Sequence, residues 1–162
     1  MSNGEDTGID FATARGRDWP SVRQFNVFLE NRVGALLNVV RRFESTDIRI
    51  ISLTVNDLAD CAIIRIVLSD PERGLEVLRQ AKLPVTESDL LIVQLPDSPQ
   101  PMAQICKALL AAEINIDYAY TLLVGPLNRA ALALHVDDHE TGVGTLSRQG
   151  FAVLTENDLS FS

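Results

Sequence analysis

The chain has 162 residues, 46% of them hydrophobic and 22% charged, so it carries enough apolar side chains to bury a sizeable core and is not disordered throughout. Its 14 basic and 22 acidic residues give a net charge of -8 without any basic block, which argues against a nucleic-acid partner. No stretch reaches the roughly 18 uncharged apolar residues of a membrane helix, and acidic residues occupy the N-terminal region, so we expect a cytoplasmic protein with no membrane partner.

The first elements follow from the spacing of apolar residues. Residues 1–22 carry three glycines among polar neighbours, which predicts a flexible N-terminal arm. Within residues 24–29, Phe25, Val27 and Leu29 recur at every second position, which predicts a strand with one buried face. Apolar residues then recur at helical spacing and predict an amphipathic helix, whose buried stripe is Leu36, Val39, Val40 and Phe43.

The next segment predicts a β-hairpin followed by a second helix. Residues 48–55 and 61–68 are rich in β-branched and apolar side chains, and they flank a polar turn. Polar residues that suit a helix cap then precede Pro71, and proline is favoured in the first turn of a helix. Residues 90–95 predict one more strand, which either closes this series or opens the next one.

The second half of the chain repeats the first. Apolar positions of the first half recur 66 residues later, in the pairs Leu36 with Met102, Val39 with Ile105, Val40 with Cys106, Phe43 with Leu109, Ile48 with Ile114, and Ile50 with Ile116. The sequence Thr-Glu-Ser-Asp-Leu at 86–90 recurs as Thr-Glu-Asn-Asp-Leu at 155–159. Such self-similarity indicates a duplicated unit. We therefore expect one domain at residues 23–88 and a second domain at residues 89–162.

Each unit has the order strand, helix, strand, strand, helix, strand. This order predicts the α+β class, as two ferredoxin-like βαββαβ units side by side, with antiparallel sheets and helices on one face. In the second unit Ala131 and Ala133 alternate with Leu132 and Leu134, so we expect another element to pack closely on the alanine side. Joining the units edge to edge, together with a homodimer, is expected to hide the edge strands.

The chain has no Walker loop, no G-x-G-x-x-G, no G-x-S-x-G and no H-E-x-x-H, so we expect neither an enzyme nor a cofactor. The run at 137–140 offers carboxylates and one imidazole, which are metal ligands. We favour helix capping over a metal site there, as at Ser69 and Asp70 in the first unit. Cys61 and Cys106 lie in apolar stretches and are expected to be buried, reduced thiols.

The turn at residues 29–36 has the features of a ligand site. Gly34 permits a tight turn, and the N–H groups of Gly34, Ala35 and Leu36 are expected at a helix N-terminus. Such groups, with the helix dipole behind them, accept a carboxylate or a phosphate, and the amide of Asn31 adds the donors and the acceptor that a zwitterion needs. The alternative is an ordinary helix start at which Asn31 acts as the cap.

The sequence from Phe28 to Leu36, followed by Ile48-x-Ile50 and by Ser-Leu-Thr-Val at 52–55, resembles the ACT domain, a ligand-sensing module of amino-acid metabolism. The similarity runs through both units, over about residues 22–160, and looks like the stand-alone tandem ACT proteins. The first unit also resembles the opening of the regulatory small subunit of acetolactate synthase and the serine-sensing domain of phosphoglycerate dehydrogenase.

The resemblance implies an amino-acid site at the interface between two ACT repeats, gripped by the loop of one repeat and by a strand asparagine of its neighbour. Carried over to this chain, the ligand-binding residues are Asn31, Arg32, Val33, Gly34, Ala35, Leu36 and Asn115. Val33 stands where the family often has proline, and Arg49 replaces the strand asparagine in the first unit. The second loop has Gln100 in place of the glycine and three prolines without N–H groups, so we expect one functional site per chain.

What the resemblance implies about function is a non-catalytic sensor. It would bind an amino acid and regulate amino-acid metabolism through a conformational or oligomeric change. The alternative is a regulatory subunit that binds a biosynthetic enzyme such as acetolactate synthase. The implied partners are a small-molecule amino acid, a second copy of the chain in a homodimer and, in the alternative, that enzyme.

Overall fold

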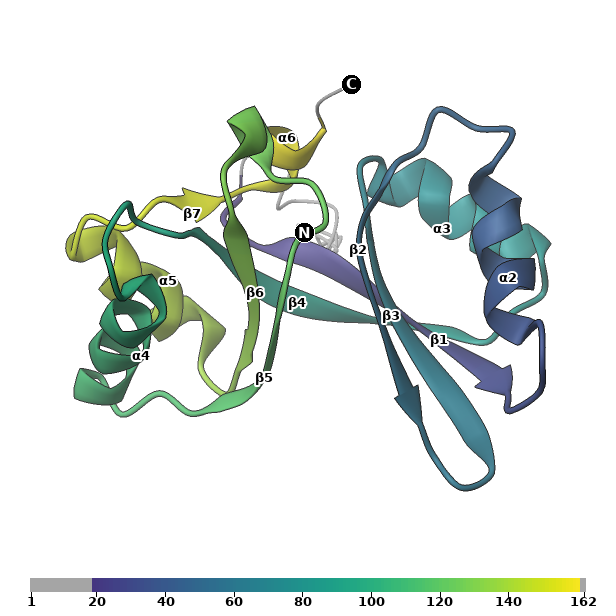
Figure 1. Cartoon of the computed structure of the whole chain (residues 1–162), viewed down its shortest axis with the longest axis horizontal. Coiled ribbons are helices and arrows are strands. Elements are labelled where there is room, and N and C mark those ends of the chain that lie inside the picture. Colours follow the sequence, from purple (N-terminus) through teal and green to yellow (C-terminus); the bar gives the residue numbers. More distant parts are fainter. Residues whose placement is uncertain (1–18, 161–162) are drawn as a thin grey trace, which may run out of the picture.

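The structure of the protein is a computed structural model, which describes residues 19–160. The chain forms two halves, each with helices on one face of an antiparallel sheet (Figure 1). The two main helices of each half lie on the outer sides of the molecule, and the uncovered faces of the two sheets lie toward each other. Within residues 19–160, no helix is long and apolar enough to cross a membrane.

The first half contains three complete strands and two helices. Its elements are β1 (Val22–Glu30), α2 (Ala35–Val40), the 3-10 turn η1 (Arg41–Phe43), β2 (Ile50–Asp57), β3 (Cys61–Leu68) and α3 (Pro71–Gln80). All pairings are antiparallel, and the strand order is β2-β3-β1 with β4 on the far side of β1. This is the strand order expected of a ferredoxin-like unit.

The second half repeats that order with shorter strands. Its elements are β4 (Val85–Gln94), α4 (Pro101–Ala111), β5 (Ile116–Thr121), the 3-10 turn η2 (Pro126–Asn128), β6 (Ala131–Val136), α5 (His139–Arg148), β7 (Val153–Leu154) and α6 (Glu156–Leu159). The order is β5-β6-β4-β7, again with antiparallel pairing throughout.

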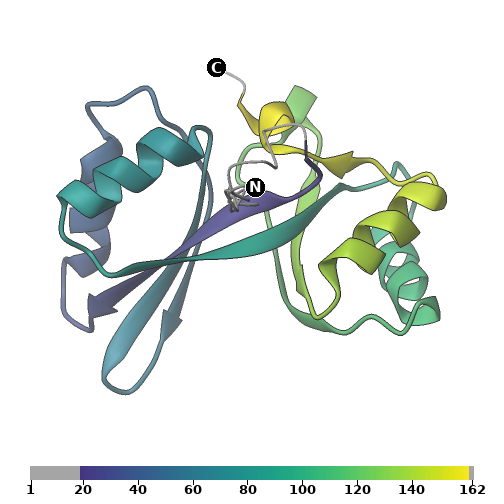
Figure 2. The same cartoon turned by 180° about the vertical axis from the view of Figure 1, so that it is seen from behind.

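Strand β4 belongs to both halves. Its residues 85–90 pair with β1, whereas residues 91–94 pair with β6 and, in part, with β7. Figure 2 shows this long strand crossing from one half to the other beside β1. The predicted boundary between residues 88 and 89 therefore falls inside a continuous strand. The predicted arm at 1–22 lies mostly outside the described residues, but Val22 is buried and begins β1.

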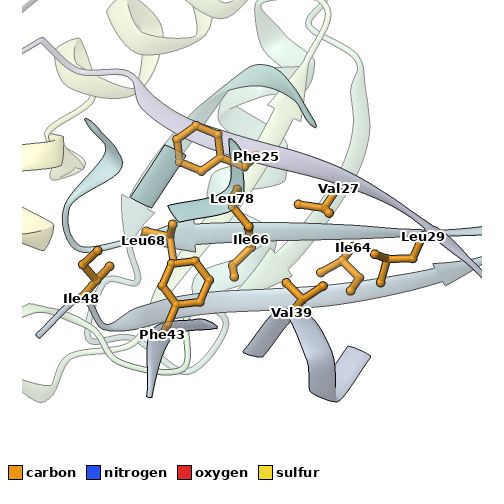
Figure 3. Close-up of a cluster of buried hydrophobic side chains, with 10 residues drawn as sticks. All are labelled: Phe25, Val27, Leu29, Val39, Phe43, Ile48, Ile64, Ile66, Leu68 and Leu78. Atoms are coloured by element: carbon orange, nitrogen blue, oxygen red, sulfur yellow. The ribbon is translucent and has the colours of Figure 1, made fainter. Parts of the chain in front are cut away.

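Three apolar cores hold the fold together. The first lies between the sheet and the helices of the first half, where side chains such as Phe25, Ile66 and Leu78 are fully buried (Figure 3). The second is its counterpart in the second half, around Leu109 and Leu146. The third lies between the two uncovered sheet faces, and its buried members are Val22, Ile51, Val67, Leu90, Ile92, Ala131, Ala133, Leu154 and Leu159.

The third core confirms the prediction made from the alternation in β6. Ala131 and Ala133 face the other half, while Leu132 and Leu134 face the helices of their own half. The two halves are joined mainly by this face-to-face packing of their sheets and by strand β4, which they share. The expected edge-to-edge joining of the two units is only a minor part of the contact. At the edges, the N–H of Leu123 donates to the carbonyl of Ile51 at 2.8 Å.

The predicted helix stripes are only half buried. Val39 is buried as expected, but Leu36, Met102 and Cys106 are exposed. The prediction of a buried Cys106 thiol is therefore wrong. One residue advances a helix by about 100°, so Cys106 points well away from Ile105, which lies at the centre of the buried face.

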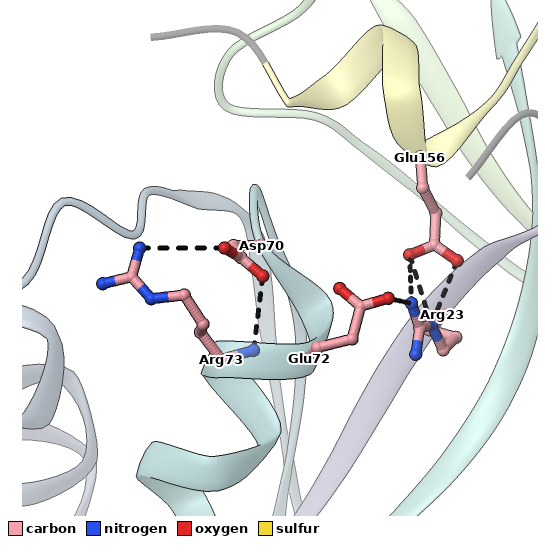
Figure 4. A network of polar contacts seen from close by, with 5 residues as sticks. All are labelled: Arg23, Asp70, Glu72, Arg73 and Glu156. Atoms are coloured by element: carbon pink, nitrogen blue, oxygen red, sulfur yellow. Dashed lines mark hydrogen bonds and ion pairs between the residues drawn. The ribbon is translucent and has the colours of Figure 1, made fainter. Parts of the chain in front are cut away.

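Arg23 on β1 connects the C-terminal helix to the first half. Its Nε donates to Oε1 of Glu156 at 3.0 Å, and its Nη2 donates to Oε1 of Glu72 on α3 at 2.6 Å (Figure 4). Glu156 on α6 is only 7% exposed. Burial lowers the pKa of Arg23, but the hydrogen bonds and the charges of the two glutamates outweigh burial and raise that pKa above its usual range.

The matching glycines Gly74 and Gly142 should respond oppositely to alanine. A Cβ at Gly74 would collide with the buried side chain of Leu68, whereas one at Gly142 would lie 3.6 Å from Val136 Cγ2, an ordinary contact. We expect Gly74→Ala to lower the free energy of unfolding by about 1–2 kcal/mol, because overpacking outweighs the helix-propensity gain. Gly142→Ala should leave it equal or raise it by up to about 1 kcal/mol. Urea denaturation of both variants checks this, and equal losses would contradict the packing described.

Candidate functional site

The loop between β1 and α2 has the backbone geometry of a glycine turn. Gly34 is the N-cap residue of α2 and has a φ of 87°, in the left-handed region that favours glycine. Within residues 19–160 no side chain caps this helix. The Asn31 amide instead donates to Oδ1 of Asp57 in the β2–β3 hairpin at 2.7 Å, so the interpretation of Asn31 as a helix cap is wrong.

A pocket of about 300 Å³ lies beside this loop. Three segments enclose it: the end of β1, the α2 helix with the 3-10 turn η1 that follows it, and the connection that leads into β4. Its lining residues are Phe28, Leu29, Glu30, Arg32, Ala35, Asn38, Val39, Arg42, Leu83 and Pro84. The volume is at the lower end of the range for small-molecule sites, which suits a compact ligand.

The polar groups of the pocket comprise two cations, one carboxylate and one amide. Arg32 Nε lies 3.6 Å from Oε2 of Glu30, and both side chains are well exposed. Among the described residues, neither Arg42 nor the side-chain amide of Asn38 has an ion pair or a hydrogen bond. Arg42 is therefore available to a carboxylate, and Glu30 offers a counter-charge to an ammonium group. Apolar side chains such as Leu83 supply the remaining wall.

The structure places the predicted site residues in two separate regions. Arg32 and Ala35 line the pocket. Asn31, Val33, Gly34 and Leu36 belong to the same loop and helix start but do not line it. Asn115 belongs to the segment between α4 and β5 in the second half. In Figure 1 this segment lies on the opposite side of the molecule from the β1–α2 loop. The N–H of Asn115 donates to Oδ1 of Asp137 at 3.0 Å and its amide to Oδ1 of Asp117 at 3.1 Å.

Sequence reasoning missed several pocket residues. Asn38 on α2 and Arg42 in the 3-10 turn η1 lie four residues apart, and both line the pocket together with Ala35. The helical spacing of these polar residues was a usable signal. Leu83 and Pro84 lie more than forty residues further along the chain, and no local pattern indicates that they approach α2.

A second polar cluster lies between the two sheets. The fully buried Gln24 donates from its amide to Tyr118 Oη at 2.8 Å and accepts from Tyr120 Oη at 2.5 Å. Arg65 lies over the Tyr118 ring with its Cζ 4.1 Å from the centroid, and the His135 ring stacks on Tyr118 at 4.9 Å. Burial is the main cause of a raised Tyr120 pKa, the nearby Tyr118 adds to it, and Arg65 opposes both. Since its groups satisfy one another across the two halves, this cluster fixes their relative position.

The acidic helix starts act as caps, as predicted. Oδ1 of Asp70 accepts from the N–H of Arg73 at 3.2 Å, and Oδ1 of Asp138 accepts from the N–H of Thr141 at 3.1 Å. Hydrogen bonds from Thr141 hold the pKa of Asp138 below its usual value. Between residues 19 and 160, His, Cys, Asp and Glu side chains form no group of three or more that could hold a metal ion.

The comparison with known families decides the family. The model of the ACT domain pair matches residues 20–161, which is nearly the whole chain. The chain belongs to the ACT domain pair family. An ACT domain pair is a regulatory module, and ACT domains bind amino-acid ligands. No curated protein matches the chain.

Solved structures share the fold at low sequence identity. Protein BT0572 from Bacteroides thetaiotaomicron superposes with a TM-score of 0.78 at 24% identity, over 88% of this chain and 97% of that chain. The ligand-free regulatory subunit of aspartate kinase from Thermus thermophilus gives a TM-score of 0.54 at 13% identity, over 79% and 91%. The corresponding subunit from Thermus flavus gives 0.51 at 13% identity, over 79% and 92%.

Proposed function

We propose that this ACT domain pair is a non-catalytic sensor that binds one amino acid in the pocket between β1, α2 and the start of β4. The observation that carries this proposal is the Arg42 guanidinium, which has no ion pair within residues 19–160 and lies at a pocket that also has apolar walls such as Val39 and Leu83. A cation without a carboxylate partner, beside apolar surface, is suited to a ligand that is anionic at one end and apolar at the other.

In this proposal the α-carboxylate of the ligand binds Arg42 and the Asn38 amide. The α-ammonium group lies toward Glu30, and the side chain contacts Leu83 and Val39. The expectation from sequence placed Asn115 opposite the loop, but Asn115 contacts Asp117 and Asp137 within its own half. We therefore place the ligand beside the loop, in the first half of the chain. The homodimer and the regulation of amino-acid metabolism remain predictions.

A thermal-shift screen with the twenty amino acids tests this function. A ligand present at 100 times its Kd should add about 2.7 kcal/mol to the free energy of unfolding, which corresponds to about 5–10 °C in Tm for a chain of this size. The decarboxylated amine of the best amino acid serves as the control, and it should give no shift. A screen in which no amino acid raises Tm would contradict the proposal.

The second candidate is a regulatory subunit that acts through direct contact with a biosynthetic enzyme such as acetolactate synthase. The observation that favours it is an exposed apolar stripe along α4, formed by Met102, Cys106 and Leu110 at four-residue spacing. Sedimentation of the chain with the purified catalytic subunit of that enzyme tests the candidate. A Leu110→Glu variant should lose the complex if the stripe is the contact.

A further inference from the structure

One wall of the pocket in the first half comes from the connection between α3 and β4. This connection supplies Leu83 and Pro84 to the lining. Proline has no N–H group, and the Pro84 carbonyl accepts the N–H of Phe28 at 3.0 Å. The N–H of Leu83 donates to the carbonyl of Leu78 on α3 at 3.4 Å. This wall therefore offers no free N–H donor to a ligand.

The polar side chains of the pocket all come from other segments. In the proposed function, Arg42 on η1 and Asn38 on α2 hold the α-carboxylate. Glu30 at the end of β1 receives the ammonium group, and Arg32 lies 3.6 Å from Glu30 in an ion pair. With these groups engaged, an oxygen atom on the ligand's side chain meets no donor at the Leu83 wall. Such an oxygen loses its hydrogen bonds to water, whereas an apolar side chain gains from the contact.

The second repeat has a phenylalanine where the first has Leu83. The N–H of Phe151 donates to the carbonyl of Leu146 at 3.0 Å, which repeats the bond from Leu83 to Leu78. Both members of the second bond lie 68 residues after their counterparts. Phe151 packs against the apolar core of its own half. The fold therefore accommodates a phenylalanine ring at this position of the repeat.

The charged groups of the pocket are confined to the first repeat. At the positions 66 residues after its three charged lining residues, the chain has only uncharged residues, namely Pro96, Ser98 and Ala108. A zwitterion therefore has charged partners in the first repeat and lacks them at the matching positions of the second repeat. The choice of ligand side chain is thus a property of one pocket per chain.

We propose that Leu83 is a specificity-determining residue, through which this pocket selects amino acids with aliphatic side chains. This role of Leu83 rests on the proposed function, since it concerns the ligand of the same pocket. An aliphatic side chain lies against Leu83 and Pro84 and removes their apolar surface from water. A polar side chain of the same shape gives up its hydrogen bonds to water there without replacement. The pocket therefore distinguishes ligands of equal shape by their polarity.

The test compares amino acids of matched shape by calorimetric titration of the full chain. Leucine and asparagine branch alike, as do valine and threonine, so the members of each pair differ mainly in polarity. We expect leucine to bind about tenfold more tightly than asparagine, and valine to bind severalfold more tightly than threonine. Equal affinities within both pairs would overturn the role of Leu83 and leave the amino-acid site in place. Absence of binding by all twenty amino acids would overturn both.

A pair of variants attributes the selection to Leu83. Leu83→Asn should bring the ratio of the leucine and asparagine affinities close to one, because the new amide can bond a polar side chain. The control Leu75→Asn changes another half-buried leucine of the same core, which does not line the pocket, and it should keep the ratio. A ratio of two affinities is independent of the folded fraction, so lost stability does not imitate the result. Equal ratios in the two variants would overturn the proposal.

Leu83→Phe tests the same wall with a residue that the fold accepts at position 151. The wall stays apolar, so leucine should still bind more tightly than asparagine. The larger ring takes up room beside the ligand, so the affinity for leucine should fall more than the affinity for valine. Unchanged affinities for both amino acids in this variant would show that the ligand does not contact Leu83, and would overturn the proposal.

Discussion

Replacement of Arg23 by alanine should lower the free energy of unfolding by about 3 kcal/mol. The change removes the guanidinium that binds Glu156, whose side chain is 7% exposed, and it also releases Glu72 on α3. Breaking one side of a buried ion pair costs about 3–5 kcal/mol, and partial exposure of Arg23 places the expected loss at the lower end. Thermal and urea denaturation of the variant measure this loss.

The exposed ion pair of Arg73 provides the control. Arg73 Nη1 lies 2.8 Å from Oδ1 of Asp47, and both side chains are more than half exposed. Water and salt screen such a pair, so Arg73→Ala should leave Tm nearly unchanged. If the Arg23 and Arg73 variants lose equal stability, the contact of Arg23 with Glu156 does not hold α6 in place.

Replacement of Arg42 by glutamine should weaken amino-acid binding by about ten- to a hundredfold. A lost hydrogen bond to a charged group is worth about 1.5–3 kcal/mol, which converts to that range of affinity. Arg42 is exposed, and within residues 19–160 it has no ion pair, so the stability of the ligand-free protein should not change. Calorimetric titration with the amino acid found in the screen measures the affinity.

Arg41 is the matched control for this experiment. It is the adjacent residue, it is exposed, and it does not line the pocket. Arg41→Gln changes the net charge by the same amount, so any effect of overall charge appears in both variants. Equal losses of affinity in the Arg41 and Arg42 variants would mean that Arg42 acts through the overall electrostatic potential of the protein and not by contact with the ligand.

Much of the fold follows from patterns that are local in the sequence. Alternation in β6 predicted that another element packs closely on its alanine side, because successive residues of a strand point to opposite faces; the structure shows that this element is the sheet of the other half. The capped starts of α3 and α5 were predicted from Asp70 and Asp138, because a cap needs only a side-chain oxygen and a nearby N–H group. The 66-residue repeat predicted the same order of elements in both halves.

Other features depend on contacts between distant parts of the chain. The sequence of β4 does not show that its two ends pair with different strands, since both ends are equally suited to a sheet. The exposure of Cys106 depends on how α4 is rotated about its axis over the sheet. The apolar spacing predicted the buried side of this helix only to within about one residue, which is about 100° of rotation. The pocket needs Leu83 and Pro84 next to α2, and only the assembled fold brings them there.

A titration followed by methyl NMR tests the central claim most directly, with the amino acid that raises Tm the most as the ligand. If the ligand binds beside the β1–α2 loop, the methyl signals of Ala35, Val39 and Leu83 shift saturably, because these residues line the pocket. The methyl signals of Ile116 and Ala119, on β5 close to Asn115, stay unchanged. Saturable shifts at Ile116 and Ala119, with none at Ala35 and Val39, would contradict the account.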